Sequence, residues 1–192
     1  MRPLTAIAFD ADDTLWQNER FFQDSQRRFI SMLEPFADAD KVEAELLGAE
    51  RRNIGFYGFG GKGFTLSMLE TATMLCGDDL PPAVVRDILG LGKAMLDHPV
   101  ELLPGVVETL QALRDHYTLL VVTKGDLFDQ ERKLVQSGLA DYFDHVEIVS
   151  DKTPDVYRRV FDRHGQGPAR GMMIGNSLKS DVLPALEAGC WA

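Results

Sequence analysis

The sequence has few cysteines and lacks any long run of apolar residues. Its two cysteines, Cys76 and Cys190, lie far apart and form no Cys-x-x-Cys pair. This spacing indicates neither a zinc site nor a disulfide framework, and it fits a reducing compartment. No apolar stretch reaches the roughly 18 residues of a membrane span, and the first residues do not follow the signal-peptide pattern. We therefore expect a cytoplasmic protein.

The sequence also lacks a tract of basic residues, and its formal net charge is -10 over 192 residues. A strongly acidic chain without a basic patch is repelled by nucleic acid and by anionic membranes, so neither is expected as a partner. If the substrate is an anion, local positive groups or a metal ion must outweigh the overall field. The length suits either one domain with a sizeable core or a core with a small insertion.

Three acidic residues follow an apolar run near the start of the chain. The run from Leu4 to Phe9 predicts a short buried strand, and Asp10, Asp12 and Asp13 come directly after it. Crowded carboxylates repel one another and resist desolvation, and a divalent cation would offset both effects. A lone Asp-x-Asp pattern is more typical of a solvated turn that caps a helix than of a metal site, so other motifs must decide.

The stretch from residue 16 to residue 100 predicts helices and no strand. Apolar residues at helical spacing indicate helices over 20–36, 41–52, 64–75 and 82–97. Residues 55–64 combine five glycines with aromatic residues and Lys62, which predicts a flexible loop between two helices. Two interpretations remain open: a simple connector, or a substrate-facing loop in which Lys62 meets an anion.

The remainder of the chain alternates apolar strands with helices. Strands are predicted over 4–9, 118–122, 146–149 and 171–174, and helices over 106–116, 126–137, 154–164 and 180–188. This alternation predicts an α/β fold with a doubly wound parallel sheet. Right-handed crossovers place all carboxyl ends of the strands at one edge. The candidate site residues delivered there are Asp10, Asp12, Thr123, Lys124, Lys152, Asn176 and Asp181.

These residue types together suit phosphoryl transfer. A carboxylate such as that of Asp10 can attack phosphorus and form an acyl phosphate. The reaction depends mainly on charge neutralisation, which Lys152 and a metal ion held by Asp10 would supply. The hydroxyl of Thr123 can donate to a phosphoryl oxygen, and Asp12 can protonate the leaving group and later activate water.

Taken singly, each residue has an ordinary structural explanation. Thr123 is typical of a strand end or a helix cap, and Lys152 of a solvated surface. Asn176 and Asp181 are typical of a turn and of a helix start. Their joint occurrence, each just beyond an apolar strand, favours a site.

Over essentially its whole length, the sequence resembles the phosphatase branch of the haloacid dehalogenase superfamily with an α-helical C1-type cap. Asp10-Ala11-Asp12-Asp13-Thr14 matches the DxDxT first motif of this family. Thr123 matches the second motif, and Lys152 the lysine of the third. The segment from Gly175 to Asp181 matches the acidic fourth motif, GDxxxxD.

The resemblance implies a Rossmann-like core over residues 1–15 and 101–192 and a helical cap over residues 16–100. It further implies Asp10 as nucleophile, Asp12 as acid and base, and a magnesium ion (Mg²⁺) bound by Asp10, the backbone carbonyl of Asp12 and the fourth motif. The expected substrate is a small phosphorylated metabolite, and the expected assembly is a monomer or homodimer. Thr123, Lys124, Lys152 and Lys62 are the predicted substrate-binding residues, and Asp10, Asp12, Asn176 and Asp181 the predicted metal-binding residues.

The sequence departs from the family pattern in two places. Asn176 stands where the family usually has aspartate, so we expect a weaker metal site that is still present. The sequence stops at Ala192, where the fold of the family continues into a fifth strand. We therefore expect that strand to be missing and residues 172–174 to form an exposed sheet edge.

Asp12 also bears on which other activities of this family the sequence allows. The 2-haloacid dehalogenases of this family lack the second aspartate of the first motif, and phosphonate hydrolysis is disfavoured for the same reason. Phosphomutase activity uses that aspartate too and stays open. A catalytically weakened binding or regulatory protein is supported only by Asn176.

Overall fold

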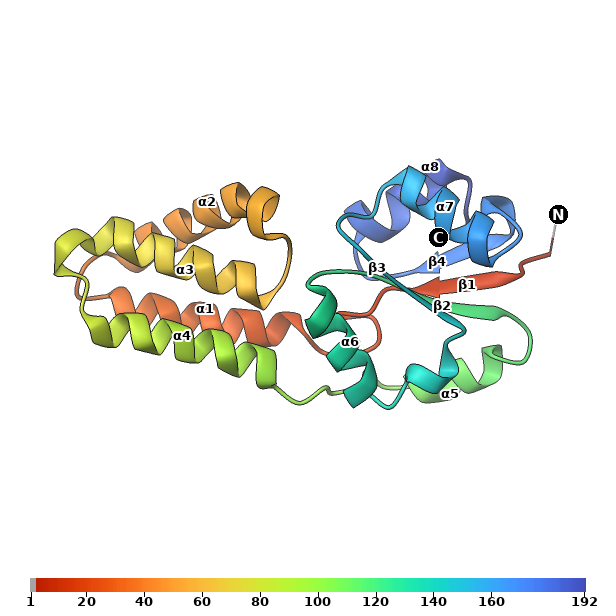
Figure 1. Cartoon of the computed structure of the whole chain (residues 1–192), viewed down its shortest axis with the longest axis horizontal. Coiled ribbons are helices and arrows are strands. Elements are labelled where there is room, and N and C mark those ends of the chain that lie inside the picture. Colours follow the sequence, from red (N-terminus) through yellow and green to blue (C-terminus); the bar gives the residue numbers. More distant parts are fainter. Residues whose placement is uncertain (1–2) are drawn as a thin grey trace. The chain divides into compact units, whose positions relative to one another are not determined.

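The computed structural model describes residues 3–192, which divide into two compact units. One unit contains the chain up to Asn18 together with Pro99–Ala192, and the other contains Glu19–His98. Figure 1 labels the helices and strands of both units. The interpretation of Glu19–His98 as a cap stays a prediction.

The first unit is built on a parallel sheet whose strand order is β3-β2-β1-β4. The strands are β1 (Ala6–Phe9), β2 (Thr118–Lys124), β3 (His145–Val149) and β4 (Gly171–Ile174). β1 lies inside the sheet, because Ile7 is in register with Leu119 of β2 on one side and Met172 of β4 on the other. The predicted parallel α/β sheet is confirmed.

Helices cover both faces of this sheet. The α-helices of the unit are α5 (Val106–Leu113), α6 (Leu127–Gln136), α7 (Pro154–His164) and α8 (Leu183–Ala188). Helices α7 and α8 lie on one side of the sheet and α5 and α6 on the other (Figure 1). Ala8 of β1 packs in the apolar cluster formed with α7 and α8, whereas Phe9 packs in the cluster formed with α5 and α6. Successive strand residues point to opposite faces, so β1 is buried from both sides, as a doubly wound sheet requires.

The helix predicted over 180–188 begins instead as a wide turn. Leu178–Val182 forms a π-helix that continues into α8. Pro184 has no N–H, so it cannot donate to the carbonyl of Ser180. The hydroxyl of Tyr157 donates to that carbonyl at 3.0 Å, and burial raises the pKa of Tyr157, which keeps the hydroxyl a donor. The turn leaves Asp181 1% exposed.

The expectation of a bare edge at β4 is only partly correct. Trp191 forms a parallel bridge with Met172, accepting at 2.8 Å from the N–H of Met173 and donating at 2.9 Å to the carbonyl of Gly171. These two bonds occupy backbone groups that an edge strand would otherwise expose. Ile174, at the end of β4, is 37% exposed.

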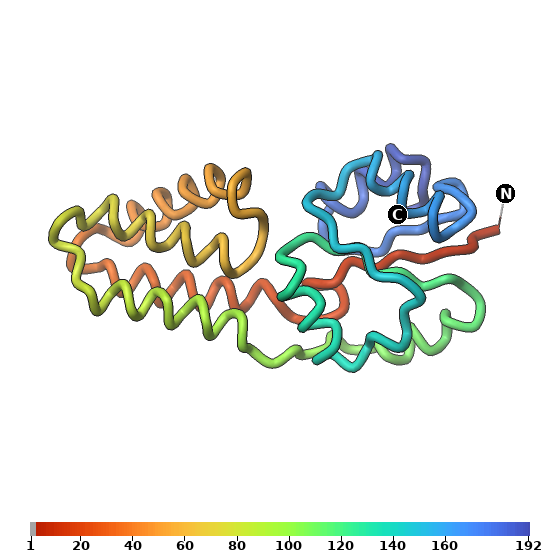
Figure 2. The backbone as a smooth tube through the Cα atoms, viewed as in Figure 1, coloured from red at the N-terminus to blue at the C-terminus, as the bar shows by residue number. Residues whose placement is uncertain are grey.

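The second unit consists of helices that run up and down in succession (Figure 2). They are α1 (Glu19–Leu33), α2 (Ala39–Tyr57), α3 (Gly61–Cys76) and α4 (Pro82–Asp97). Phe29 and Leu33 lie one turn apart on α1, and both are fully buried in an apolar cluster to which the other three helices contribute. Within residues 3–192, no helix is both long and apolar enough to cross a membrane.

The prediction of a flexible loop over residues 55–64 is wrong. α2 extends to Tyr57 and α3 starts at Gly61, so the connection is short. Gly58 and Gly60 adopt positive φ angles of 72° and 117°, which glycine tolerates best. A Cβ on Gly63 would lie 2.9 Å from the carbonyl oxygen of Gly58. These glycines make a tight turn and a close helix contact possible.

Helix α4 offers a test of glycine packing in this unit. A Cβ on Gly92 would lie 2.2 Å from Oγ1 of Thr65 on α3, whereas a Cβ on Gly90 would meet nothing within 4 Å. We expect Gly92→Ala to lower the free energy of unfolding by about 1–3 kcal/mol through overpacking. Gly90→Ala should leave it unchanged or raise it by up to about 1 kcal/mol, because alanine favours helix. Urea unfolding of both variants measures this, and equal stabilities would contradict the close contact.

Candidate active site

The carboxyl ends of the parallel strands lie at one edge of the sheet, and candidate residues follow them. Asp10 directly follows β1, and Lys152 comes shortly after β3. Thr123 and Lys124 are the last residues of β2, which therefore extends two residues beyond its predicted end. Asn176 lies in the segment between β4 and the π-helix. The topology therefore delivers these residues to the predicted edge.

Lys152 connects two acidic residues that are far apart in the sequence. Its Nζ donates to Oδ1 of Asp10 and, at 2.6 Å, to Oδ1 of Asp181. The three residues are 5%, 7% and 1% exposed, respectively. Gly175 allows this arrangement, because a Cβ there would lie 2.4 Å from the carboxyl carbon of Asp181. One buried ammonium thus stands between two buried carboxylates.

The charges at this cluster do not balance. Burial raises the pKa of Asp10 to about 6; the Lys152 ammonium opposes this rise, and the negative charges of Asp181 and Asp12 add to it. Two buried carboxylates, Asp10 and Asp181, share the single ammonium of Lys152, so the cluster has a surplus of negative charge. A divalent cation would offset that surplus.

The chemistry of the donor set fits Mg²⁺. Magnesium prefers oxygen ligands and usually keeps several waters, so it needs few protein groups. No group of three or more histidine, cysteine, aspartate or glutamate side chains among residues 3–192 could hold a metal ion. The predicted site therefore depends on neutral oxygens beside Asp10: the backbone carbonyl of Asp12 and the amide of Asn176, which is exposed. Asp181 is already engaged, since its Oδ2 accepts from the N–H of Ser177 at 2.9 Å.

The turn after β1 gives Asp10 and Asp12 different surroundings. Asp13 adopts a positive φ of 60°, a conformation that aspartate tolerates better than most residues. Whereas Asp10 contacts Lys152, the side chain of Asp12 accepts from Nε1 of Trp16 at 2.8 Å and from Nζ of Lys133 at 2.9 Å. A third donor, Nε2 of Gln130, lies 2.8 Å from its Oδ2. Two carboxylates that are neighbours in the sequence thus have separate sets of partners.

The sequence analysis missed Gln130 and Lys133. Both lie on the buried face of α6 together with Leu134, at positions where an amphipathic helix normally carries apolar side chains. Two long polar residues within one buried stripe were a signal that could have found them. Nothing in the sequence around Trp16 indicated its role, because its indole N–H reaches Asp12 only when the turn after β1 has formed.

The remaining predicted residues are only partly brought together. Thr123 is 2% exposed, and its hydroxyl makes a long contact of 3.4 Å to the carbonyl of Lys124. The Nζ of Lys124 donates to Oγ of Ser180 at 2.9 Å and lies 3.5 Å from Asp151, so it links the segments that follow β3 and β4. Lys62 is exposed in the first turn of α3, in the other unit. Substrate contact by Lys62 stays a prediction that the substrate ranking of a Lys62→Ala variant would test.

Comparison with known proteins identifies the family. A sequence model of the haloacid dehalogenase-like hydrolases matches residues 4–189, and the chain therefore belongs to this family. A crystal structure of a haloacid dehalogenase-like family hydrolase from Xanthomonas campestris is 42% identical, with a TM-score of 0.92. The match covers 98% of this chain and 79% of that one.

Curated relatives of the chain include named phosphatases. Glyceraldehyde 3-phosphate phosphatase of Methanopyrus kandleri is 26% identical over 97% of this chain and 81% of its own length. Pyrimidine 5'-nucleotidase YjjG of Escherichia coli is 29% identical over 53% of this chain and 50% of its own length. The first likeness extends across both units, because it covers nearly all of the chain.

The Lys152 cluster predicts a specific response to mutation. Lys152→Met removes the ammonium and leaves the buried carboxylates of Asp10 and Asp181 unpaired, so we expect a loss of about 3–5 kcal/mol of unfolding free energy. Asp181→Asn, added to that variant, should restore part of the loss because one buried charge is removed.

Urea unfolding in the presence of EDTA measures these differences without bound cations. Lys179→Met is the matched control, because Lys179 is exposed and its loss should change stability by less than about 0.5 kcal/mol. A Lys152→Met variant as stable as the control would show that the ammonium does not hold the two acids.

Proposed function

We propose that this protein is a Mg²⁺-dependent phosphatase that hydrolyses small phosphomonoesters through an aspartyl phosphate (an acyl phosphate) formed on Asp10. The observation that carries the proposal is the contact of Lys152 with Asp10 at the carboxyl edge of the sheet, with Asp12 two residues further on. The naming of relatives as phosphatases, among them one that aligns with 97% of this chain, supports the same activity.

In the first half-reaction a carboxylate oxygen of Asp10 attacks phosphorus, and the bond from phosphorus to the leaving-group oxygen breaks. Asp12, in its protonated form, gives its proton to that oxygen. Lys152 neutralises negative charge on the nucleophile before the attack and on the phosphoryl group during it. Thr123, at the end of β2, is the proposed donor to a phosphoryl oxygen.

In the second half-reaction a water molecule attacks the phosphorus of the aspartyl phosphate. Asp12, now a carboxylate, accepts the proton of this water, and the bond from phosphorus to Asp10 breaks. Inorganic phosphate leaves, and Asp12 is protonated for the next cycle. Mg²⁺, held by Asp10, the Asp12 carbonyl and Asn176, would supply charge neutralisation at the phosphoryl oxygens.

The proposed substrates are small phosphorylated metabolites in a reducing cytoplasm. Cys76 and Cys190 are both free and buried, which suits such a compartment. Relatives named for glyceraldehyde 3-phosphate and for pyrimidine 5'-nucleotides make a phosphorylated triose and pyrimidine nucleoside monophosphates the first compounds to assay.

The role of Asp10 can be tested with one substitution. Asp10→Asn replaces the attacking carboxylate by an amide, a poor nucleophile, so we expect nearly complete loss of phosphate release. The assay measures inorganic phosphate from p-nitrophenyl phosphate and from the metabolite panel, with Mg²⁺ and again with EDTA. Asp40→Asn, a change of an exposed aspartate on α2, is the control. Wild-type turnover by Asp10→Asn would reject the mechanism, and an inactive wild type would favour a binding protein.

Asn176 provides a test of the metal site. Asn176→Asp adds a negative charge to a proposed hard-cation site, so we expect Mg²⁺ to bind more tightly. Calorimetric titration of Mg²⁺ into both proteins measures the affinity directly, and activity against Mg²⁺ concentration gives a second value. If the affinity in the variant were equal or weaker, Asn176 would not be a metal ligand.

A further inference from the structure

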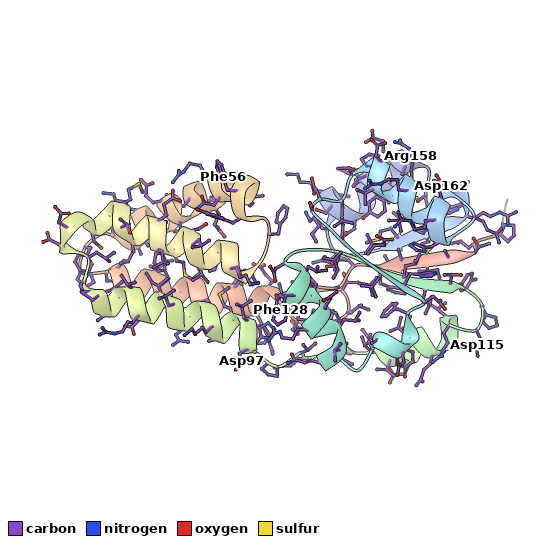
Figure 3. All side chains as sticks on the ribbon, viewed as in Figure 1. Phe56, Asp97, Asp115, Phe128, Arg158 and Asp162 are labelled. Carbon is purple, nitrogen blue, oxygen red and sulfur yellow. The ribbon has the colours of Figure 1, made fainter. Side chains whose placement is uncertain are left out.

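Helix α6 points two long polar side chains at Asp12. Gln130 and Lys133 are only 4% and 3% exposed, whereas Phe128 on the same helix (labelled in Figure 3) is 71% exposed. Burying polar groups costs free energy unless they gain specific partners. The partners of Gln130 and Lys133 therefore indicate why these residues occupy the buried face.

The ammonium of Lys133 contacts both carboxylate oxygens of Asp12 and further oxygens beside it. Its Nζ lies 2.9 Å from Oδ1 and 3.2 Å from Oδ2 of Asp12, and it donates at 3.0 Å to Oδ1 of Asn18. A further contact of 3.4 Å joins it to Asp129 on the preceding turn of α6. An ammonium has three N–H donors, and three residues share them here. The contacts to Asp12, Asn18 and Asp129 together fix the position of the Lys133 ammonium.

Gln130 is placed at a cost to stability. Its Nε2 donates to Oδ2 of Asp12 at 2.8 Å and to the carbonyl of Lys124 at 3.3 Å. Its Oε1 is buried and has no hydrogen-bond partner in the described part of the chain, which costs roughly 1–3 kcal/mol. Gly125 makes room for it, because a Cβ there would lie 2.9 Å from Nε2. The hydrogen bond to Asp12 is the interaction that explains why a glutamine is buried here.

We propose that Gln130 and Lys133 are positioning residues that hold Asp12 for the second half-reaction, the release of phosphate from Asp10. This inference rests on the proposed phosphatase function. In that step the oxygen of water bonds to phosphorus, the bond from phosphorus to Asp10 breaks, and the proton of water passes to Asp12. The electron pair of the broken bond stays on the carboxylate of Asp10.

The hydrogen bonds at Asp12 fix the orientation of the carboxylate that acts as the base in the second step. Each carboxylate oxygen accepts from two donors: Oδ1 from Trp16 and Lys133, and Oδ2 from Gln130 and Lys133. An ionised carboxylate only accepts hydrogen bonds, so this set of donors matches the form that takes a proton from water. Fixed orientation is what makes such a group an effective base.

Gln130→Met is the decisive variant. It keeps the length of the side chain, removes the donor to Asp12 and also removes the buried unpaired oxygen. We therefore expect a melting temperature equal to or above that of the wild type, together with slower turnover. Lys133→Met is the second variant, and Gln136→Met on the exposed part of α6 is the matched control.

The measurement is stopped-flow release of p-nitrophenolate from p-nitrophenyl phosphate with Mg²⁺. This leaving group departs without a proton, so the first half-reaction proceeds in the variants. We expect a rapid burst of one p-nitrophenolate per active site, followed by a steady-state rate about 10- to 100-fold below that of the wild type, part of the effect of a positioned base. The control should match the wild type.

Two results would overturn the proposal: wild-type steady-state rates in Gln130→Met, or a loss of rate without a burst. If Lys133→Met does not fold, Gln130→Met alone decides. Failure of the proposed function is distinguishable, because it would show in the wild type as no Mg²⁺-dependent release of p-nitrophenolate. An active wild type with an unaffected Gln130→Met would reject only the positioning role.

Discussion

A single buried ammonium between two buried carboxylates is the interaction on which the site depends. Lys152 is 142 residues from Asp10 and 29 residues from Asp181, so the contact forms only when three segments of the sheet edge are in place. Burying three ionised groups is costly, and apolar residues of similar volume would often be at least as stable. The cluster is therefore better explained by chemistry than by stability. Gly175 and the π-helix near Asp181 are local departures from regular structure that make it possible.

The cost of burying like charges also explains why Asp10 and Asp12 contact different partners. Two carboxylates so close in sequence would repel one another if they shared one environment. The turn at Asp13 reduces this repulsion, because it places Asp10 beside Lys152 and Asp12 beside Lys133. The two acids then contact different ammonium groups, which suits a reaction in which one attacks and the other moves protons.

The parts of the fold that depend on local pattern could be predicted from the sequence. Apolar runs located the strands, and helix α7 was predicted with the bounds Pro154–His164 because a proline opens it and Gly165 follows it. The glycines near residue 60 were misjudged, since their role depends on a contact between Gly63 and Gly58 that composition does not show. The π-helix was missed because it depends on Tyr157, a residue of another helix.

The candidate residues that follow strand ends could be named from the sequence, and their catalytic roles stay proposals. Asp10, Lys152 and Asp181 could be named because each lies just beyond an apolar strand. The polar stripe of α6 could have drawn attention to Gln130 and Lys133. Their partner Asp12 could not be predicted, since nothing local to α6 tells which strand end its buried face will meet. Which acid Lys152 would contact was also beyond the sequence, because that depends on the register of β1 against β4.

The position of β1 inside the sheet has a consequence for how the active protein forms. The strand that precedes Asp10, the proposed nucleophile, is synthesised before the other strands of the sheet, yet its residue Ile7 pairs with Leu119 of β2 and Met172 of β4. Pairings over such long sequence separations are slow to form and come late in folding. Asp10, Lys152 and Asp181 therefore cannot meet in a chain that has folded only part of this unit. The proposed active site therefore forms only when the sheet is complete. A measurement of turnover would report complete folding of the unit, which a measurement of helix content alone would not.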